Sequence, residues 1–213
     1  MSEAIVRVPL FPLAGAILFP RSQLPLHIFE PRYRAMIEDA GSALGRIGMI
    51  QPQGVGDQVD DHPPLYRVGC IGEIIGLEEL DDGRFNIILQ GSQRFRLIAE
   101  ADVGTAYRQA DVDTAAFDDS EPQPLGLAQR SEVEREARRL GDAMGLTVDW
   151  AAVNRLDDEM LVNAIAQVAP FDAGAKQALL EEATLAGRAD LLVQLMQFLR
   201  AAHGGSDLSP RLQ

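Results

Sequence analysis

Apolar runs alternate with prolines over the first thirty residues, and this pattern predicts several short β-strands. One apolar run ends at Pro9, a turn follows at Ala14-Gly15, a second run is halted by Pro20, and a third extends from Leu24 to Phe29. Proline lacks the N–H that a strand ladder needs, so such strands are short or lie at a sheet edge. The opening of the chain is therefore expected to be rich in short strands.

A helix is predicted directly after Phe29. In the segment Glu30-Pro31-Arg32-Tyr33, proline stands where the first helical residue would lie, and apolar residues then recur at helical spacing at Met36, Ile37 and Ala40. Proline is favoured at the first helical position because its fixed φ suits the helix and its missing N–H is not needed there. We expect a strand-to-helix junction at this point.

Further strands are predicted up to about residue 112. Two β-rich runs, 65–75 and 85–89, are joined by a segment in which Asp82-Gly83 supplies the positive φ of a hairpin turn. Residues 90–93 predict another reversal, and the segments 94–98 and 107–112 alternate polar with apolar residues. These features together indicate a small β-barrel-like domain.

The second part of the chain predicts helices. Ser131 with Glu134 has the spacing of a capping box, and aspartates that precede apolar periodic segments are candidate N-caps, namely Asp149, Asp157 or Asp158, and Asp172. Gly145 and Pro170 are expected to end helices. The sequence thus predicts an α+β protein: a β domain over 1–117, a connection over 118–127, a helical bundle over 128–203 and a disordered tail over 204–213.

Charge restricts the partners that we expect. The 213-residue chain has a net charge of −13 and a pI near 4.6, and only residues 1–50 are nearly neutral, with five arginines and four acids. A strongly acidic surface repels phosphate backbones and anionic lipids. We therefore expect neither a nucleic-acid partner nor a membrane partner.

The remaining composition favours a cytoplasmic protein. No apolar stretch approaches the roughly 20 residues that cross a bilayer, and the acidic start of the chain resembles neither a signal peptide nor a transit peptide. Cys70 is the only cysteine, so an internal disulfide is excluded. These features are typical of a reducing compartment.

Residues for catalysis or metal binding are not arranged as known chemistry requires. The sequence has no Gly-x-x-x-x-Gly-Lys-Ser/Thr phosphate loop, and its single lysine, Lys176, falls in a predicted amphipathic helix. The three histidines and Cys70 lack the paired spacing of zinc ligands. We therefore predict a non-enzymatic protein with no cofactor and no metal.

Several segments together resemble the N-terminal, substrate-recognition domain of Lon proteases. The resemblance begins with the proline-rich opening and Leu24-Pro-Leu-His-Ile-Phe-Glu-Pro-Arg-Tyr33. It continues through Tyr66 to Ile75, Asp81-Asp82-Gly83, Leu89 to Arg96, Lys176 to Glu181, and Arg188, so it covers roughly residues 5–200.

The resemblance implies a PUA-like β pseudo-barrel with a short helix, followed by a helical bundle, in a free-standing module without the ATPase and protease domains. It implies binding of unfolded or exposed hydrophobic polypeptide segments, as an adaptor or regulator of proteolysis. A protease or chaperone is a further partner to consider, and the oligomeric state stays open.

The candidate peptide-binding residues come from the opening segment, and they are Phe11, Leu13, Leu18, Phe19, His27 and Phe29. Packing in the barrel core is the first interpretation of their apolar members, and a shallow groove is the second.

The residues that match the family signature are expected to be structural, and they are Glu30, Pro31, Arg32, Tyr33, Gly91, Arg94, Lys176 and Arg188. We expect Glu30 to cap the helix, Arg32 to pair with a carboxylate, and His27 to be a hydrogen-bonded packing residue. Arg94 and Arg96 are either solvated or paired with the acidic helical part, and the second role, which docks the two parts of the chain, is the one that we expect.

Two other function classes remain open at this stage. PUA-like barrels in other families bind RNA, but the acidic composition disfavours that function here. A small-molecule sensor with a pocket between barrel and bundle is the second alternative.

Overall fold

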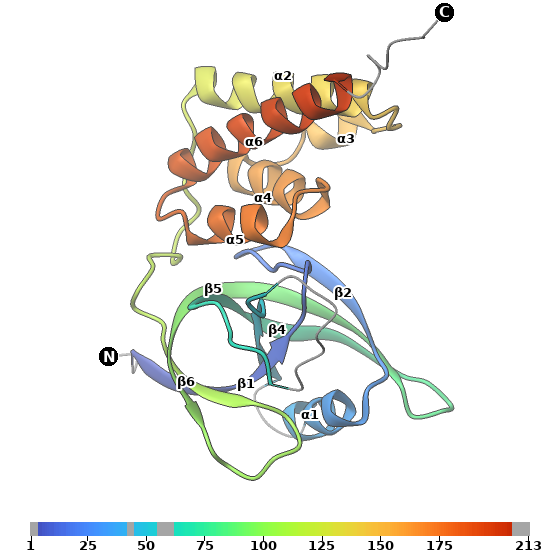
Figure 1. Cartoon of the computed structure of the whole chain (residues 1–213), viewed down its shortest axis with the longest axis vertical. Helices are drawn as coiled ribbons and strands as arrows, with labels where there is room; N and C mark the ends of the chain where they lie inside the picture. Colours follow the sequence, from blue (N-terminus) through green and yellow to red (C-terminus); the bar gives the residue numbers. More distant parts are fainter. Residues whose placement is uncertain (1–3, 42–44, 55–61, 206–213) are drawn as a thin grey trace, which may run out of the picture. The chain divides into compact units, whose positions relative to one another are not determined.

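The chain folds into two compact units. The computed structural model describes residues 4–41, 45–54 and 62–205, and the division falls between Glu121 and Pro122. The first unit is a β-sheet with one helix, and the second consists of helices (Figure 1). The predicted α+β class is confirmed. Each unit is described by itself below.

The first unit has six strands, β1 (Ile5–Pro12), β2 (Gln23–Ile28), β3 (Arg46–Ile50), β4 (Val68–Glu79), β5 (Phe85–Ala101) and β6 (Gln109–Asp113). β1 pairs in parallel with β3, and the other pairings, β3–β4, β4–β5, β5–β6 and β6–β1, are antiparallel. These five pairings close a circuit. β2 stands outside the circuit, because β5 is its only strand partner among the described residues.

The proline-rich opening differs in two places from the prediction. β1 continues through Pro9 to Pro12, because the strand pairs with β6 over residues 5–9 and with β3 over residues 10–12. The apolar run 16–19 is not a strand but a buried loop that fills the core. The predicted strand before Phe29 is confirmed as β2, and the helix α1 (Pro31–Gly41) begins at proline as expected.

The reversal expected at residues 90–93 is wrong, because β5 passes straight through this segment. Ile71 pairs with Gln93 and Gly72 pairs with Gly91, so Ser92 is an extra residue that forms a β-bulge. A bulge bends a strand without ending it. Glycine is required at position 91, because a Cβ there would collide with the main-chain oxygen of Phe19.

Phe95 lies at the centre of the barrel core. Its ring covers Gly48 and Gly69, where a Cβ would meet the ring closely. Around it pack buried side chains from every strand of the circuit or from the loop before β4, namely Val8, Leu10, Ile50, Leu65, Ile71, Ala110 and Val112. The core is therefore continuous around the circuit.

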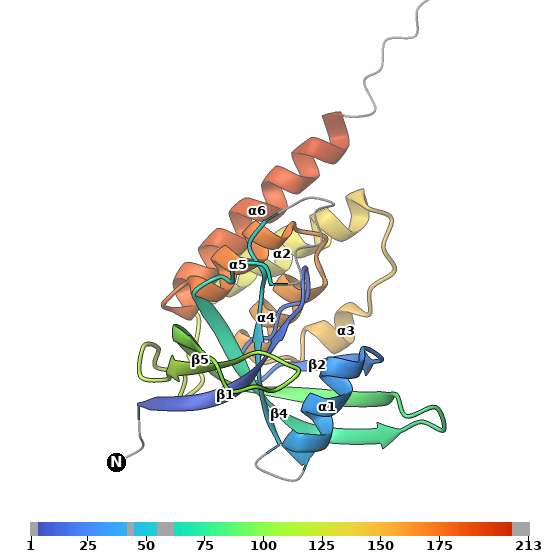
Figure 2. The ribbon, with the colours of Figure 1, turned by 60° about the horizontal axis from the view of Figure 1, so that its bottom comes forward.

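The second unit contains α2 (Leu127–Ala143), α3 (Trp150–Val153), α4 (Asp158–Val168), α5 (Ala173–Glu181) and α6 (Leu185–Gly205). α6 runs beside α2 (Figure 2). The N-caps predicted at Asp149, Asp157 and Asp172 are confirmed, since each carboxylate accepts a main-chain N–H three residues on. The capping box at Ser131 is wrong, because α2 begins at Leu127 with Gly126 as its N-cap. Most of the tail expected over 204–213 lies outside the described residues.

A buried ion pair fixes the end of the first unit. Arg94 is 1 % exposed, and its Nη2 and Nε donate to the Asp119 carboxylate at 2.8 and 3.1 Å. The main-chain N–H of Arg94 donates to the same carboxylate, and the Phe117 ring stacks on the guanidinium. Arg94 therefore pairs with Asp119 of its own unit, a partner that the sequence did not indicate.

Loss of either partner of this pair is expected to destabilise the first unit strongly. Arg94→Met or Asp119→Asn leaves one buried charge without its counter-ion, which costs about 3–5 kcal/mol. Urea unfolding followed by circular dichroism measures the loss. The double variant Arg94→Met/Asp119→Leu should recover most of the loss, since no lone charge remains. Arg7→Met, which breaks the exposed pair with Asp111, is the control and should unfold near the wild-type midpoint. Equal midpoints for Arg94→Met and the control would contradict this role.

Candidate functional site

The opening segment contributes more to the core than to the surface. Phe11, Leu18 and Phe19 are 5 %, 1 % and 0 % exposed, so they pack the core and offer no surface to a ligand in this structure. Leu13 is half-buried. Phe29, by contrast, is 61 % exposed. The groove interpretation of the buried rings therefore has no support, and the surface must be sought elsewhere.

A groove of about 470 Å³ lies where β2, β5 and the end of β4 run side by side. We call it the hairpin groove, and its lining residues are Pro25, Leu26, His27, Gly76, Leu77, Glu78, Asn86, Ile87 and Ile88. Leu77 and Ile88 are 53 % and 39 % exposed, and the exposed side chains of Ile75 and Phe29 lie next to groove residues in sequence or in space. Exposed apolar side chains therefore gather in and beside this groove.

Sequence reasoning missed most of the groove. Of its lining residues, only His27 is among the peptide-binding candidates from the sequence. The candidate Phe29 lies beside the groove. One signal was available: Ile87 and Ile88 are consecutive in an alternating strand, and successive strand residues point to opposite faces. One of the two therefore had to face away from the core, and Ile88 does.

A polar row crosses the three strands within the groove. The Asn86 Nδ2 donates to Glu78 Oε2 at 2.8 Å, and the Asn86 Oδ1 lies 2.8 Å from His27 Nδ1. Arg84 Nη1 lies 3.1 Å from His27 Nε2. A guanidinium only donates, so Nε2 accepts and Nδ1 carries the proton. His27 is hydrogen-bonded as predicted, but it is exposed rather than packed inside.

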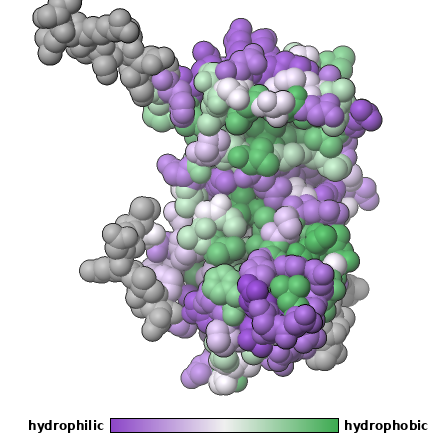
Figure 3. Space-filling view, turned by 90° about the vertical axis from the view of Figure 1, so that its right-hand side faces the viewer, coloured by the Kyte–Doolittle hydropathy of each residue, from purple (hydrophilic) through white to green (hydrophobic). Residues whose placement is uncertain are grey.

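The hairpin that carries the groove is acidic. Between residues 75 and 88 there are four acids, Glu78, Glu79, Asp81 and Asp82, and one base, Arg84. All four acids are exposed. Figure 3 faces the tip of this hairpin and shows hydrophilic surface there beside hydrophobic surface. An apolar groove with an acidic rim results.

The family-signature residues at the start of α1 hold the helix in place. The Glu30 carboxylate accepts from Arg32 Nε at 3.0 Å, which confirms the expected pairing of Arg32, and the Glu30 main-chain oxygen accepts the N–H groups of Tyr33 and Arg34. Arg32 lies over the Tyr33 ring at 4.7 Å, and that ring packs on Phe11 at 4.4 Å. The helix is thus anchored to β1.

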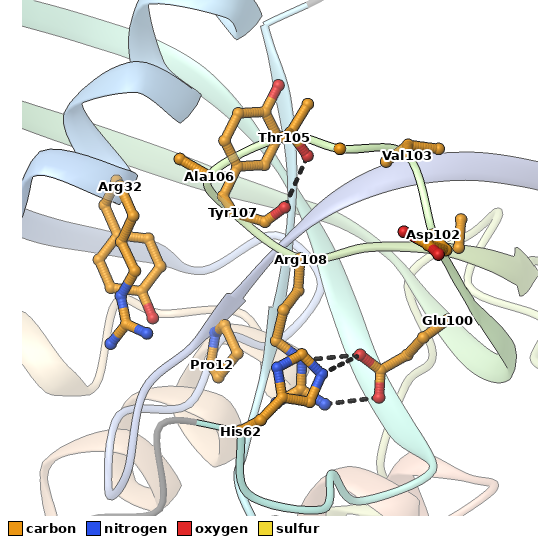
Figure 4. Close-up of a pocket in the computed structure, with 13 residues that line it drawn as sticks. Pro12, Arg32, His62, Glu100, Asp102, Val103, Thr105, Ala106, Tyr107 and Arg108 are labelled. Carbon is orange, nitrogen blue, oxygen red and sulfur yellow. Dashed lines mark hydrogen bonds and ion pairs between the residues drawn. The ribbon is translucent and has the colours of Figure 1, made fainter.

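A second pocket, of about 460 Å³, lies beside the start of α1 (Figure 4). Its wall includes Arg32 and Tyr33, Pro12 of β1, and the end of β5 with the loop to β6, residues 100–108. Arg108 donates to Glu100 at 2.7 Å through Nε, and this hydrogen bond is the largest cause of the lowered pKa of Glu100. We call this pocket the Tyr33 pocket.

The two signature residues of the helical unit are structural. Arg188 is 2 % exposed and donates to Asn163 Oδ1 at 2.8 Å and to the Leu179 main-chain oxygen at 3.0 Å. The Lys176 Nζ donates to the Gln167 main-chain oxygen at 2.9 Å, and burial lowers the pKa of Lys176. Both side chains satisfy main-chain or amide groups between helices rather than facing a site.

The helical unit has an apolar opening of its own, of about 170 Å³, lined by residues that include Leu140, Trp150, Leu156, Ile165 and Met196. Within the described residues, no cluster of three or more His, Cys, Asp or Glu side chains is arranged to hold a metal. In the same residues, no helix is long and apolar enough to cross a membrane. The candidate sites are therefore the hairpin groove, the Tyr33 pocket and this apolar opening.

Comparison with known proteins identifies the family. The family model of the ATP-dependent protease La (LON) substrate-binding domain matches residues 7–197. The chain belongs to the Lon substrate-binding domain family.

Curated relatives agree with this assignment. Lon protease 2 of Herpetosiphon aurantiacus is 28 % identical over 181 residues, which are 83 % of this chain and 22 % of that protein. Lon protease of Parabacteroides distasonis is 33 % identical over 90 residues, which are 42 % of this chain and 11 % of that protein. The chain thus spans less than a quarter of the length of these two relatives, and the part that it shares is the substrate-binding domain.

Solved structures show the same fold. The Lon N-terminal domain protein from Xanthomonas campestris has a TM-score of 0.65 at 20 % identity, covering 89 % of this chain and 98 % of that one. The N-terminal domain of the Mycobacterium avium complex Lon protease also has a TM-score of 0.65, at 19 % identity, covering 90 % and 98 %. Because these identities are low, the similarity shows only that the chain has the fold of the Lon substrate-binding domain.

Two phenylalanine substitutions should separate core from surface. Phe19→Ser removes a buried ring and buries a hydroxyl, which should cost about 3 kcal/mol or more and lower the urea midpoint clearly. Phe29→Ser changes an exposed ring and should leave the midpoint near the wild-type value. Circular dichroism and urea unfolding of both variants provide the measurement. A Phe29→Ser variant as unstable as Phe19→Ser would show that Phe29 is part of the packing.

Proposed function

We propose that this protein binds extended, apolar segments of other polypeptides at the hairpin groove. The observation that carries the proposal is the position of this apolar groove on β2, the strand outside the closed circuit, in a member of a substrate-binding domain family. Unfolded chains expose the apolar side chains and the unpaired main chain that such a surface accepts. Their recognition needs no catalytic group.

An edge strand adds main-chain hydrogen bonds to apolar contact. An extended peptide that lies along β2 can pair with its outer main-chain groups while alternate side chains lie beside Pro25 and His27, two of the β2 residues that line the groove. The same exposed edge is a risk for self-association. Pro25 within β2 reduces that risk, because proline lacks one main-chain donor and interrupts a regular ladder.

The acidic rim adds selectivity among peptides. Exposed carboxylates at Glu78, Glu79, Asp81 and Asp82 attract cationic residues and repel anionic ones. We therefore expect apolar segments that are followed by lysine or arginine to bind better than those followed by aspartate or glutamate. The same rim disfavours RNA.

The affinity is expected to be modest. Ordering a flexible peptide costs several kcal/mol, and a shallow groove returns limited apolar contact, so dissociation constants of about a micromolar or weaker follow. Weak, sequence-tolerant binding suits a protein that samples many unfolded chains. Delivery of such chains to a protease, as an adaptor or regulator, is the role we propose in the cell.

Peptide binding is best tested by fluorescence anisotropy with a labelled, apolar and basic peptide. The variant Leu77→Ser/Ile88→Ser should weaken binding by about tenfold or more, because two exposed aliphatic side chains among the lining residues of the groove are lost. Ile98→Ser is the matched control, since Ile98 is a 47 % exposed isoleucine on the same strand outside the groove. Undiminished binding by the double variant would overturn the proposal.

Two changes to the peptide test the mode of binding. N-methylation at alternate residues removes main-chain donors and should abolish binding if the peptide adds to β2 as a strand. Replacement of its basic residues by glutamate should weaken binding, and this difference should shrink as salt is added. An RNA oligomer at two salt concentrations tests the alternative function, and saturable binding of RNA alone would refute peptide recognition.

A further inference from the structure

Two hydrogen-bond donors of the Tyr33 pocket have no partner in the part of the chain that the structure describes. Tyr33 is only 6 % exposed, its ring is held between Phe11 and Arg32, and its hydroxyl has no hydrogen-bond partner among the described residues. Arg32 uses Nε and Nη2 for Glu30, and within the same part of the chain its Nη1 is not hydrogen-bonded. The hydroxyl oxygen itself is not fully buried, so solvent, and therefore a ligand, can reach it. Both residues line the pocket.

Arg108 and Glu100, two other charged residues of the pocket, are already paired with each other. Arg108 donates to Glu100 through Nε and to the Pro63 main-chain oxygen through Nη1, and His62 lies 3.4 Å from Glu100. Figure 4 shows Arg32 on one side of the pocket and Glu100 and Asp102 on the other. The pocket therefore has a donor side, with Arg32 and Tyr33, and an opposite side on which Glu100 is paired with Arg108 and Asp102 is exposed.

We propose that the Tyr33 pocket binds a carboxylate attached to a short apolar body, with the carboxylate accepting from Tyr33 Oη and Arg32 Nη1. The apolar body would lie against Pro12 and Ala106, which line the same pocket. Two sources share this chemistry: the C-terminal residue of a polypeptide and a free small carboxylic acid.

The charges of the pocket favour a monoanion over other ligands. A cation would face Arg32, which lies on the donor side of the pocket. A phosphate dianion would face Glu100 and Asp102 across the pocket, with only one incompletely paired arginine to bind it. Burial raises the pKa of Tyr33, although Arg32 acts in the opposite sense, so the hydroxyl stays protonated near neutral pH and donates. A carboxylate accepts from both donors and carries a single charge.

This inference does not depend on the hairpin groove, which shares no lining residue with the Tyr33 pocket. Only the polypeptide source rests on the proposed function. The two binding proposals can therefore be refuted independently. The groove variant Leu77→Ser/Ile88→Ser leaves the Tyr33 pocket intact, and a pocket variant leaves the groove intact.

The test compares N-acetyl-alanine with its uncharged counterpart N-acetyl-alaninamide by NMR titration of the full chain. The acid should shift resonances of residues around Tyr33 and Ala106 saturably, and the amide should bind at least about tenfold more weakly. Tyr33→Phe keeps the ring that packs on Phe11 but removes the hydroxyl, and it should weaken binding of the acid by a similar factor. Tyr66→Phe is the control and should bind like the wild type. Equal binding of acid and amide, or full binding by Tyr33→Phe, would overturn the proposal.

A second comparison distinguishes the two sources. An apolar peptide with a free C-terminus and the same peptide with an amidated C-terminus are titrated into the wild type, Tyr33→Phe and the groove variant. A preference for the free C-terminus that disappears in Tyr33→Phe and persists in the groove variant supports the polypeptide source. Binding of N-acetyl-alanine without any such peptide preference assigns the pocket to small carboxylic acids. Arg32→Gln should weaken binding of either ligand. Unchanged binding by this variant would contradict the donor role of Arg32.

Discussion

The buried pair between Arg94 and Asp119 is the interaction on which the first unit depends. Arg94 lies on β5 two residues after the bulge at Ser92, and Asp119 lies near the end of the unit. The pair therefore ties the segment that leaves β6 back onto the middle of β5. Arg21 Nη2 also donates to the Asp119 main-chain oxygen at 2.9 Å, so the loop before β2 is fixed at the same point. Three segments distant in sequence thus meet at one residue, Asp119.

Both candidate sites of the first unit are built on the strand that this pair holds. Ile88, near one end of β5, lines the hairpin groove, and Glu100, near its other end, lines the Tyr33 pocket. The strand bends between them at the bulge, where Gly91 allows the Phe19 main chain to approach. The buried Phe19 thus shapes β5 and offers no surface of its own to a ligand.

Sequence reasoning succeeded where local chemistry decides the structure. Proline at position 31 and aspartates at 149, 157 and 172 act within one helical turn, so their roles follow from neighbours in the chain. It failed at residues 90–93, where the polar Gln-Gly-Ser-Gln segment suggests a turn but the pairing with β4 accommodates it as a bulge. It failed for Arg94 too, because the position of Asp119 depends on the path of a connection that carries no periodic signal. Long-range contacts decided both cases.

The same limit explains why the candidate site moved from the opening segment to the hairpin. An apolar residue in a strand is read as core until the far neighbours that cover it, or fail to cover it, are known. Phe11 is covered by Tyr33. Leu77 and Ile88, by contrast, lie on the β4–β5 hairpin and are 53 % and 39 % exposed. Tyr33 combines a core contact with an open polar group. Its ring packs against Phe11, whereas its hydroxyl has no partner among the described residues, and the residue lines a pocket. Side chains that pack an apolar part in the core and leave a polar group without a protein partner are therefore the ones to examine for binding in this fold.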